Sequence, residues 1–133
     1  MPNPLLYDRD VEFVLYEILE ADKLCELADF ADHSRETFDL FLGSAKKFAR
    51  EVLFPAYKPM DEAPPKLEGE NVKVHPAMKE IYPLLIELGM MSATRPVDVG
   101  GQQLPFTIAS AAGAYLAAAN LSAAGYLMLT RYA

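Results

Sequence analysis

Cysteine and positive charge are both scarce in this 133-residue sequence. Its one cysteine, Cys25, cannot form a disulfide within the chain, which fits a reducing compartment and leads us to expect a cytoplasmic protein. The opening residues MPNPLLYDRD contain neither a basic segment nor an apolar core, so they do not form a secretory signal peptide. With 12 Lys and Arg against 19 Asp and Glu, the net charge of −7 argues against a nucleic-acid partner, because such partners are bound by clustered cations.

The sequence also lacks the patterns that mark metal, phosphate or nucleophile sites. His33 and His75 stand apart from other ligand types, and neither belongs to a zinc-binding motif, so no metal site is expected. Gly100-Gly101 has neither the preceding strand nor the following lysine of a phosphate-binding loop, and is interpreted as a turn that needs positive φ. Cys25 has no partner base in a recognisable pattern, so packing is its simplest role.

No charged residue occurs from Val99 to Thr130, which raises the possibility of a membrane segment. The run is long enough to span a bilayer, but glycines, glutamines and Pro105 open it, and Asn120 and Ser122 interrupt it. Much of the remainder is alanine, which contributes little to insertion. Two closely packed buried helices are therefore the favoured interpretation, with a membrane-associated protein as an alternative.

Helical spacing of apolar residues predicts the first half of the fold. An apolar stripe follows Asp8 and Asp10, either of which can cap a first helix; its members are Val11, Val14, Leu15, Ile18 and Leu19. A short helical turn is expected over 24–30. The strongest pattern predicts a helix that begins after Ser34 as N-cap and ends at Pro55.

The second half alternates between breakers and apolar runs. Residues 56–75 are expected to be irregular, with a small hairpin near 67–74. Pro76 should open a fourth helix that ends at Gly89, and Pro83 should either bend this helix or push its first part into a separate turn. Pro105 should open a fifth helix. Asn120 and Ser122 are interpreted as a C-cap followed by an N-cap, with a sixth helix from about Leu121. The predicted fold class is all-α, a five- to six-helix orthogonal or up-down bundle.

Three stretches together resemble the acyl-CoA dehydrogenases. Residues 85–133 contain a helix that ends in Leu88-Gly89, a loop with Pro, Asp and Gly-Gly, and two Ala-rich helices, similar to the second half of that family's N-terminal helical domain. YDRDVEFVLYEILEADKL (7–24) and KFAREVLFPAYKPMDE (47–62) resemble the subgroup similar to 3-methylmercaptopropionyl-CoA dehydrogenase. The family often has glycine where this chain has Gln103, and glutamate near the position of Asp98.

The resemblance implies a domain organisation and a role. Residues 1–30 would be the subgroup's N-terminal extension, and residues 31–133 the N-terminal helical domain of a longer, oligomeric FAD enzyme. Such an enzyme converts an acyl-CoA to a trans-2-enoyl-CoA and passes electrons to an electron-transfer flavoprotein. FAD and the catalytic glutamate would be held by other domains, so no catalytic residue and no bound FAD are expected here. The last helix would line the acyl-chain slot through Ala124, Met128 and Tyr132.

The apolar stretch from Asn120 to Ala133 supports two interpretations. If the chain is one domain of a dehydrogenase, this stretch is expected to be covered by residues outside the chain. If the chain is a freestanding interaction module, the same helix would grip a partner protein.

Overall fold

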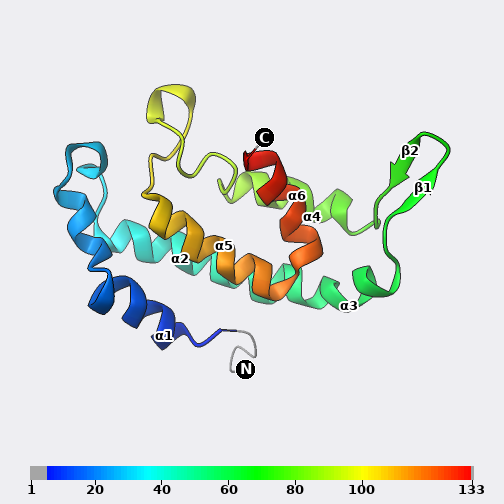
Figure 1. The fold of residues 1–133 in the computed structure, drawn as a ribbon, viewed down its shortest axis with the longest axis horizontal. Helices are drawn as coiled ribbons and strands as arrows, with labels where there is room; N and C mark the ends of the chain where they lie inside the picture. The colour runs from blue at the N-terminus through cyan, green and yellow to red at the C-terminus, as the bar shows by residue number, and fades with distance from the viewer. Residues whose placement is uncertain (1–5, 133) are drawn as a thin grey trace.

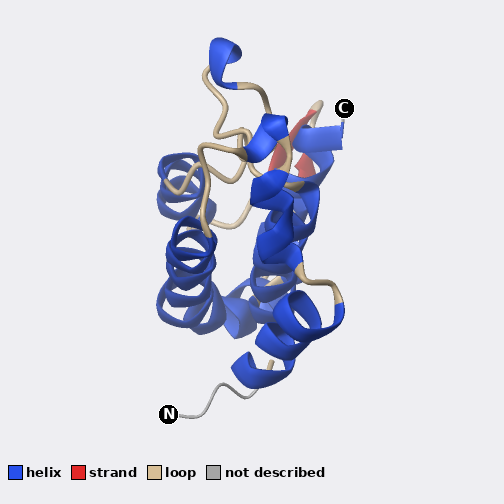
Figure 2. Cartoon of the chain, turned by 90° about the vertical axis from the view of Figure 1, so that its left-hand side faces the viewer, coloured by secondary structure: helices blue, strands red, loops and turns tan. Residues whose placement is uncertain are grey.

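The computed structural model describes residues 6–132, and the side chains of residues 6–129. Most of this part of the chain is helical, and strands occur only in one small hairpin (Figures 1 and 2). The α-helices are α1 Asp8–Glu12, α2 Arg35–Phe48, α3 Phe54–Glu62, α4 Met78–Glu87, α5 Phe106–Ala119 and α6 Leu121–Tyr132. The predicted all-α fold class is confirmed.

The start of α2 follows the sequence prediction. Ser34 Oγ accepts a hydrogen bond from the backbone N–H of Thr37, and Thr37 Oγ1 accepts one from the N–H of Ser34. These reciprocal bonds satisfy two backbone donors that the first helical turn leaves without partners. Ser34 is therefore the N-cap, as predicted.

The predicted end of this helix at Pro55 is wrong. The chain continues from α2 through a π-turn, Ala49–Leu53, directly into α3, which ends at Glu62. Proline breaks an α-helix because it lacks an N–H and crowds the carbonyl four residues earlier. The π-turn shifts the hydrogen-bond register, so Pro55 lies in the first turn of a new α-helical segment, where its missing donor costs little. Residues 56–62, expected to be irregular, are helical as a result.

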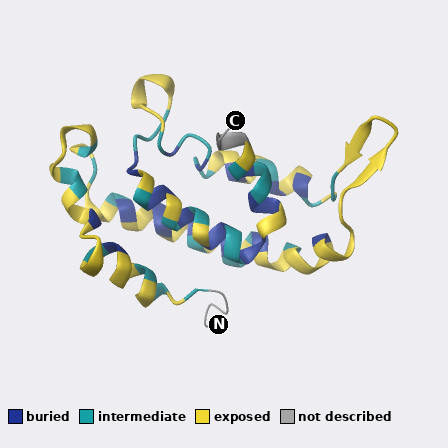
Figure 3. Ribbon diagram, viewed as in Figure 1, coloured by how far each residue is buried: buried dark blue, intermediate teal, exposed yellow. Residues whose placement is uncertain are grey.

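The predicted hairpin is present. Strands β1 Lys66–Glu68 and β2 Asn71–Lys73 pair antiparallel, with Leu67 opposite Val72. Gly69 adopts φ 64° in the turn between them. The hairpin projects from one end of the molecule, and all of its residues are exposed (Figure 3).

Helix α4 and the loop after it largely match the prediction. The helix begins at Met78, after a turn that contains Pro76, and runs through Pro83 without interruption. Gly89 ends it with φ 74°, and Gly100 adopts φ 78° in the following loop. Gly101 is needed for a different reason, because a Cβ there would overlap the backbone of Arg95.

Asn120 forms the junction between α5 and α6. Its Oδ1 accepts a hydrogen bond from the N–H of Ala123 at 3.0 Å, so Asn120 is itself the N-cap of α6. Its Nδ2 lies 3.3 Å from the carbonyl oxygen of Leu53 and 3.4 Å from Sδ of Met60. The predicted boundary is correct, but the N-cap assigned to Ser122, which is exposed, is wrong.

The core lies where α2 and α5 run side by side, with α6 against α5 and α4 against α6 (Figure 1). Small residues on α5 let its backbone approach α2 closely. The ribbons of both helices carry dark blue segments in Figure 3, which mark buried residues. The buried residues are Phe38, Phe41, Leu42, Ala45 and Phe48 on α2, and Ile108, Ala109, Ala112, Tyr115, Leu116 and Ala119 on α5.

Helix α6 is covered on one face within this chain. Ala123, Ala124 and Leu127 are buried, whereas Leu121 is 65% exposed and Leu129 is 76% exposed. No helix in the described part of the chain combines the length and the hydropathy needed to cross a bilayer.

The segment Tyr7–Phe30, here called the N-terminal arm, differs from the prediction. It comprises α1, a π-turn at Phe13–Ile18, and short 3₁₀ turns at Ala21–Glu26 and Ala28–Phe30, the last two in place of the single turn expected. Of the predicted apolar stripe, only Leu15 is buried. The stripe assumed a period of 3.6 residues, and the π-turn changes that period, so most of the stripe points outward.

Candidate functional site

A partly open apolar groove lies between α5 and α6, with a volume of about 250 Å³. We call it the α5–α6 groove. It is lined by Met90, Ala109, Ser110, Gly113, Ala114, Leu116, Ala117, Ala124, Leu127 and Met128.

The groove exists because one face of α5 carries only small residues. Ser110, Gly113, Ala114 and Ala117 are three or four residues apart, so they share a side of the helix. They leave space that larger side chains would fill. The junction at Asn120 fixes the angle at which α6 leaves this face.

The chemistry of the lining suits an apolar ligand. Met90, Ala124 and Leu127 are at most 2% exposed and form the floor, while Ser110 and Ala114 are exposed at the mouth. None of the lining residues is charged, and Ser110 supplies their single hydroxyl group. Such a surface can bury methylene groups, at about 0.8 kcal/mol each, but it offers no partner for a phosphate or carboxylate.

Two of the three residues predicted to line an acyl slot border this groove. Ala124 is fully buried in the floor and half-buried Met128 lies on one wall. Tyr132 belongs to α6, but its side chain lies outside the described part of the structure. The binding of an acyl chain by these residues stays a prediction.

The α5 wall and Met90 were not predicted as site residues. The spacing of the small residues on α5 could have predicted the groove, because a helix face without bulky side chains leaves room for a ligand or for a closely packed helix. For Met90 there was no local signal, since it follows α4 and reaches the groove only through the fold.

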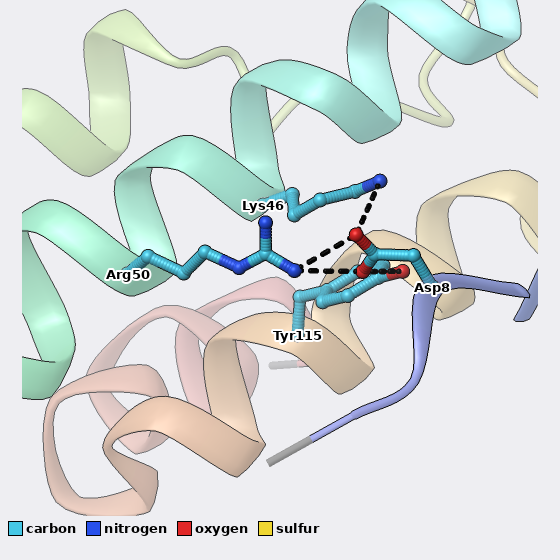
Figure 4. A network of polar contacts seen from close by, with 4 residues as sticks. All are labelled: Asp8, Lys46, Arg50 and Tyr115. Atoms are coloured by element: carbon cyan, nitrogen blue, oxygen red, sulfur yellow. Dashed lines mark hydrogen bonds and ion pairs between the residues drawn. The ribbon is translucent and has the colours of Figure 1, made fainter. Parts of the chain in front are cut away.

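A charged cluster holds the N-terminal arm against the bundle (Figure 4). One nitrogen of the Arg50 guanidinium lies 2.8 Å from each carboxylate oxygen of Asp8, and Lys46 Nζ lies 3.3 Å away. Tyr115 donates its hydroxyl hydrogen to Asp8 at 3.1 Å. The prediction of Asp8 or Asp10 as a helix cap is wrong, because the N-cap is Tyr7 without a side-chain bond and the Asp8 carboxylate binds these three groups instead.

The cluster shifts the titration of its members. Burial alone would raise the pKa of Asp8, but the bonds and charges of Arg50, Lys46 and Tyr115 outweigh it and lower that pKa. The pKa of Tyr115 is raised, first by burial and then by the negative charge of Asp8. Asp8 is thus ionised and Tyr115 neutral at pH 7, the states that keep the cluster together.

The two histidines form hydrogen bonds with the backbone, and the cysteine is half-buried. His33 Nε2 lies 2.9 Å from the carbonyl oxygen of Gln102, and His75 Nδ1 accepts from the N–H of Ala77 at 3.1 Å. Cys25 is half-buried, and burial followed by the charge of Asp22 raises the pKa of its thiol, which disfavours the nucleophilic thiolate. The described residues contain no group of three ligands that could hold a metal ion.

Fold and groove define the class of protein: an all-α domain with an apolar groove between its two Ala-rich helices. Its relationship to known proteins comes from the comparison of sequences. The chain is 34% identical over 92 residues to a butyryl-CoA dehydrogenase of Syntrophomonas wolfei subsp. wolfei (strain DSM 2245B / Goettingen). The aligned stretch covers 66% of this chain and 15% of the relative's length. No known family model matches the chain. The similarity supports a relationship to the acyl-CoA dehydrogenases, at the level of the family and not of a subgroup.

Proposed function

We propose that residues 31–133 form the N-terminal helical domain of an FAD-dependent acyl-CoA dehydrogenase, preceded by an extension over residues 1–30. The α5–α6 groove, which is apolar and borders two predicted acyl-slot residues, is the observation that carries this role. The 34% identity to a butyryl-CoA dehydrogenase supports the family.

The groove lining does not fit FAD itself. A dinucleotide needs donors or cations for its phosphates, and the lining residues provide only the hydroxyl of Ser110. We therefore assign FAD to domains outside this chain, together with the glutamate base. In this family FAD accepts the hydride. The task left to this region is to hold the acyl chain and keep water away from it.

The size of the groove favours a short acyl chain. Ligand pockets commonly measure roughly 300–1,000 Å³, whereas this groove measures about 250 Å³ within this chain alone. Met128 narrows it from the α6 side, and a methionine can adapt its shape to the chain that it contacts. We propose that Met128, with Ala124 and Tyr132, sets the length of acyl chain that the enzyme accepts.

The finer assignments belong to this proposal as well. We propose that the enzyme belongs to the subgroup similar to 3-methylmercaptopropionyl-CoA dehydrogenase, because residues 7–24 and 47–62 resemble that subgroup. We also propose that it acts as a homo-oligomer in the cytoplasm, with an electron-transfer flavoprotein as electron acceptor. Comparing turnover of 3-methylmercaptopropionyl-CoA with that of butyryl-CoA tests the subgroup. A preference for straight-chain substrates alone would contradict it.

The activity itself is tested on the full protein that carries this chain. We expect the purified protein to contain FAD and to reduce an artificial electron acceptor when butyryl-CoA is added. A protein that carries no flavin, or that oxidises no acyl-CoA of any chain length, would overturn the proposal.

The role of the groove is tested by variants in the same full protein. Met128→Ala widens the groove, so we expect the preferred acyl chain to lengthen, with kcat/KM changing about fourfold per methylene newly buried. Ala117→Val should have the opposite effect, because Ala117 lines the groove.

Two matched variants serve as controls. Ala118 is half-buried on the same helix as Ala117 but does not line the groove, and Met91 is half-buried like Met128 but lies outside it. Ala118→Val and Met91→Ala should leave chain-length preference unchanged. If Tyr132→Ala and Met128→Ala also leave it unchanged, the groove is packing and not a substrate wall.

A further inference from the structure

Helix α6 is held in place by a side chain that does not line the α5–α6 groove. Asn120 lies at the junction of α5 and α6, is 1% exposed and is not among the lining residues. Apart from Tyr115, no other polar side chain is buried among residues 6–129. Burial of an amide costs free energy unless its donor and acceptor groups are hydrogen-bonded, so the partners of Asn120 show what its side chain does.

Both ends of the Asn120 amide have partners. Oδ1 accepts from the N–H of Ala123 in the first turn of α6, at 3.0 Å. Nδ2 lies 3.3 Å from the carbonyl oxygen of Leu53, the last residue of the π-turn, and 3.4 Å from Sδ of Met60 on α3. We call these two contacts of Nδ2 the Asn120 tether. The tether joins the start of α6 to the π-turn and α3, and not to α5.

On the side of α5, the groove gives α6 little support. The α5 wall contains Gly113, Ala114 and Ala117, and α6 contributes Ala124 to the floor. A Cβ at Gly113 would meet no atom within 4 Å, so the space beside this wall is empty. Protein interiors close such spaces where the backbone can move, because unfilled apolar space forfeits dispersion contacts. Small side chains would let α6 approach α5, so a contact outside the groove must oppose that movement.

We propose that the Asn120 tether keeps α6 away from the small-residue face of α5 and thereby holds the groove open. Figure 1 shows α6 leaving the line of α5 at the junction where Asn120 lies. The consequence for substrates rests on the acyl-binding role proposed above: Asn120 is then a positioning residue for chain length, which acts through α6 and touches no substrate.

Xenon, a small apolar probe, tests the tether without any assumption about substrates. Crystals of the full protein that carries this chain are pressurised with xenon, and the occupancy in the groove is measured. Asn120→Ser keeps an N-cap oxygen but loses the amide donor. We expect it to lower the occupancy severalfold and to move α6 toward α5. Met60→Leu removes one partner of the tether at nearly constant volume, so it should lower the occupancy by a smaller factor.

Ser34→Ala is the matched control for lost stability. It removes the N-cap of α2, a loss similar to that expected for Asn120→Ser, but Ser34 does not line the groove. Its xenon occupancy should equal that of the wild type. Circular dichroism checks that every variant keeps its helical content.

The chain-length preference of the same variants tests the positioning role. We expect Asn120→Ser to lower the ratio of kcat/KM for hexanoyl-CoA to that for butyryl-CoA, by about fourfold for each methylene that no longer fits. Ser34→Ala should leave this ratio unchanged, because a loss of folded protein lowers both values equally. Ala117→Val fills the space that α6 would enter, so adding Asn120→Ser to it should change the ratio little further.

The outcomes separate this inference from the proposed function. A protein that oxidises no acyl-CoA overturns the proposed function, and the xenon occupancy still decides the tether. Wild-type occupancy in Asn120→Ser, or an equal loss in Ser34→Ala, overturns the tether even in an active dehydrogenase. A loss of xenon in Asn120→Ser with an unchanged ratio of hexanoyl-CoA to butyryl-CoA turnover overturns the positioning role alone.

Discussion

Replacing Asn120 should separate two contributions that one buried side chain makes to the fold. Asn120 is 1% exposed at the junction that sets the angle between α5 and α6. Its Oδ1 caps α6 through Ala123, and its Nδ2 donates to the carbonyl of Leu53, at the point where the π-turn passes into α3. The same side chain thus ties the groove helices to the long helical run 67 residues earlier.

The magnitudes follow from these two bonds. Loss of an N-cap costs about 1 kcal/mol, and loss of a neutral buried hydrogen bond costs about another 1 kcal/mol. Asn120→Ala should therefore lower the free energy of unfolding by about 2 kcal/mol. Asn120→Ser keeps an N-cap oxygen but cannot reproduce the amide donor, so it should lose only about 1 kcal/mol.

Asn120→Asp gives a pH-dependent version of the same experiment. An ionised carboxylate can cap α6, but it cannot donate to Leu53 and its burial raises its pKa in the folded protein. The destabilisation should be small below the unfolded-state pKa of about 3.9 and grow as the pH rises toward the folded-state pKa. It should therefore exceed that of Asn120→Ala at pH 7.

Urea unfolding, monitored by circular dichroism, measures these differences. They show as a shift in the urea concentration at the midpoint, with the slope of the unfolding free energy against urea unchanged. The reasoning is refuted if Asn120→Ala and Asn120→Ser destabilise equally, because the cap and the donor would then not be separate contributions. It is also refuted if the effect of Asn120→Asp does not depend on pH.

Two further predictions concern other parts of the fold. Asp8→Asn should cost about 0.5–1 kcal/mol of unfolding free energy at pH 7, a value discounted for the 35% exposure of Asp8. Folding lowers the pKa of Asp8, so this stabilisation exists above the unfolded-state pKa and disappears as the pH falls through the folded-state pKa. In urea titrations the wild type and the variant should therefore converge as the pH is lowered below both pKa values, and a difference that persists in acid would contradict an ionic origin. Gly101→Ala should destabilise by about 1–3 kcal/mol through overlap with Arg95, whereas Gly43→Ala, which meets nothing within 4 Å in α2, should stabilise by about 0.5–1 kcal/mol in thermal melts. Equal effects at the two glycines would show that backbone propensity, and not the close approach at Gly101, governs both.

The loop after α4 shows how a departure from a family pattern can be accommodated. Gln103, at a position where the resembling family often has glycine, adopts φ 51°. A non-glycine residue is strained there. Its side chain compensates by accepting from the N–H of Val97 and donating to the carbonyl of Asp29, which is 74 residues away in sequence.

The sequence by itself determined the features that depend on a few neighbouring residues. Ser34 as N-cap, a small hairpin near residues 67–74, the stop at Gly89 and the boundary at Asn120 were all predictable. Each rests on a backbone dihedral angle or on hydrogen bonds between residues a few positions apart, so the local sequence contains both partners.

Only the tertiary structure decided the π-turns, the continuation of the helix through Pro55, the outward face of the arm and the role of Asp8 in the charged cluster. The partners of Asp8 lie 42 residues away at Arg50 and 107 residues away at Tyr115. A π-turn shifts the helical register, and in the N-terminal arm it leaves most of the predicted apolar stripe exposed. Contacts between distant residues have no local sequence signature, because the free energy that favours them exists only once the helices have packed together.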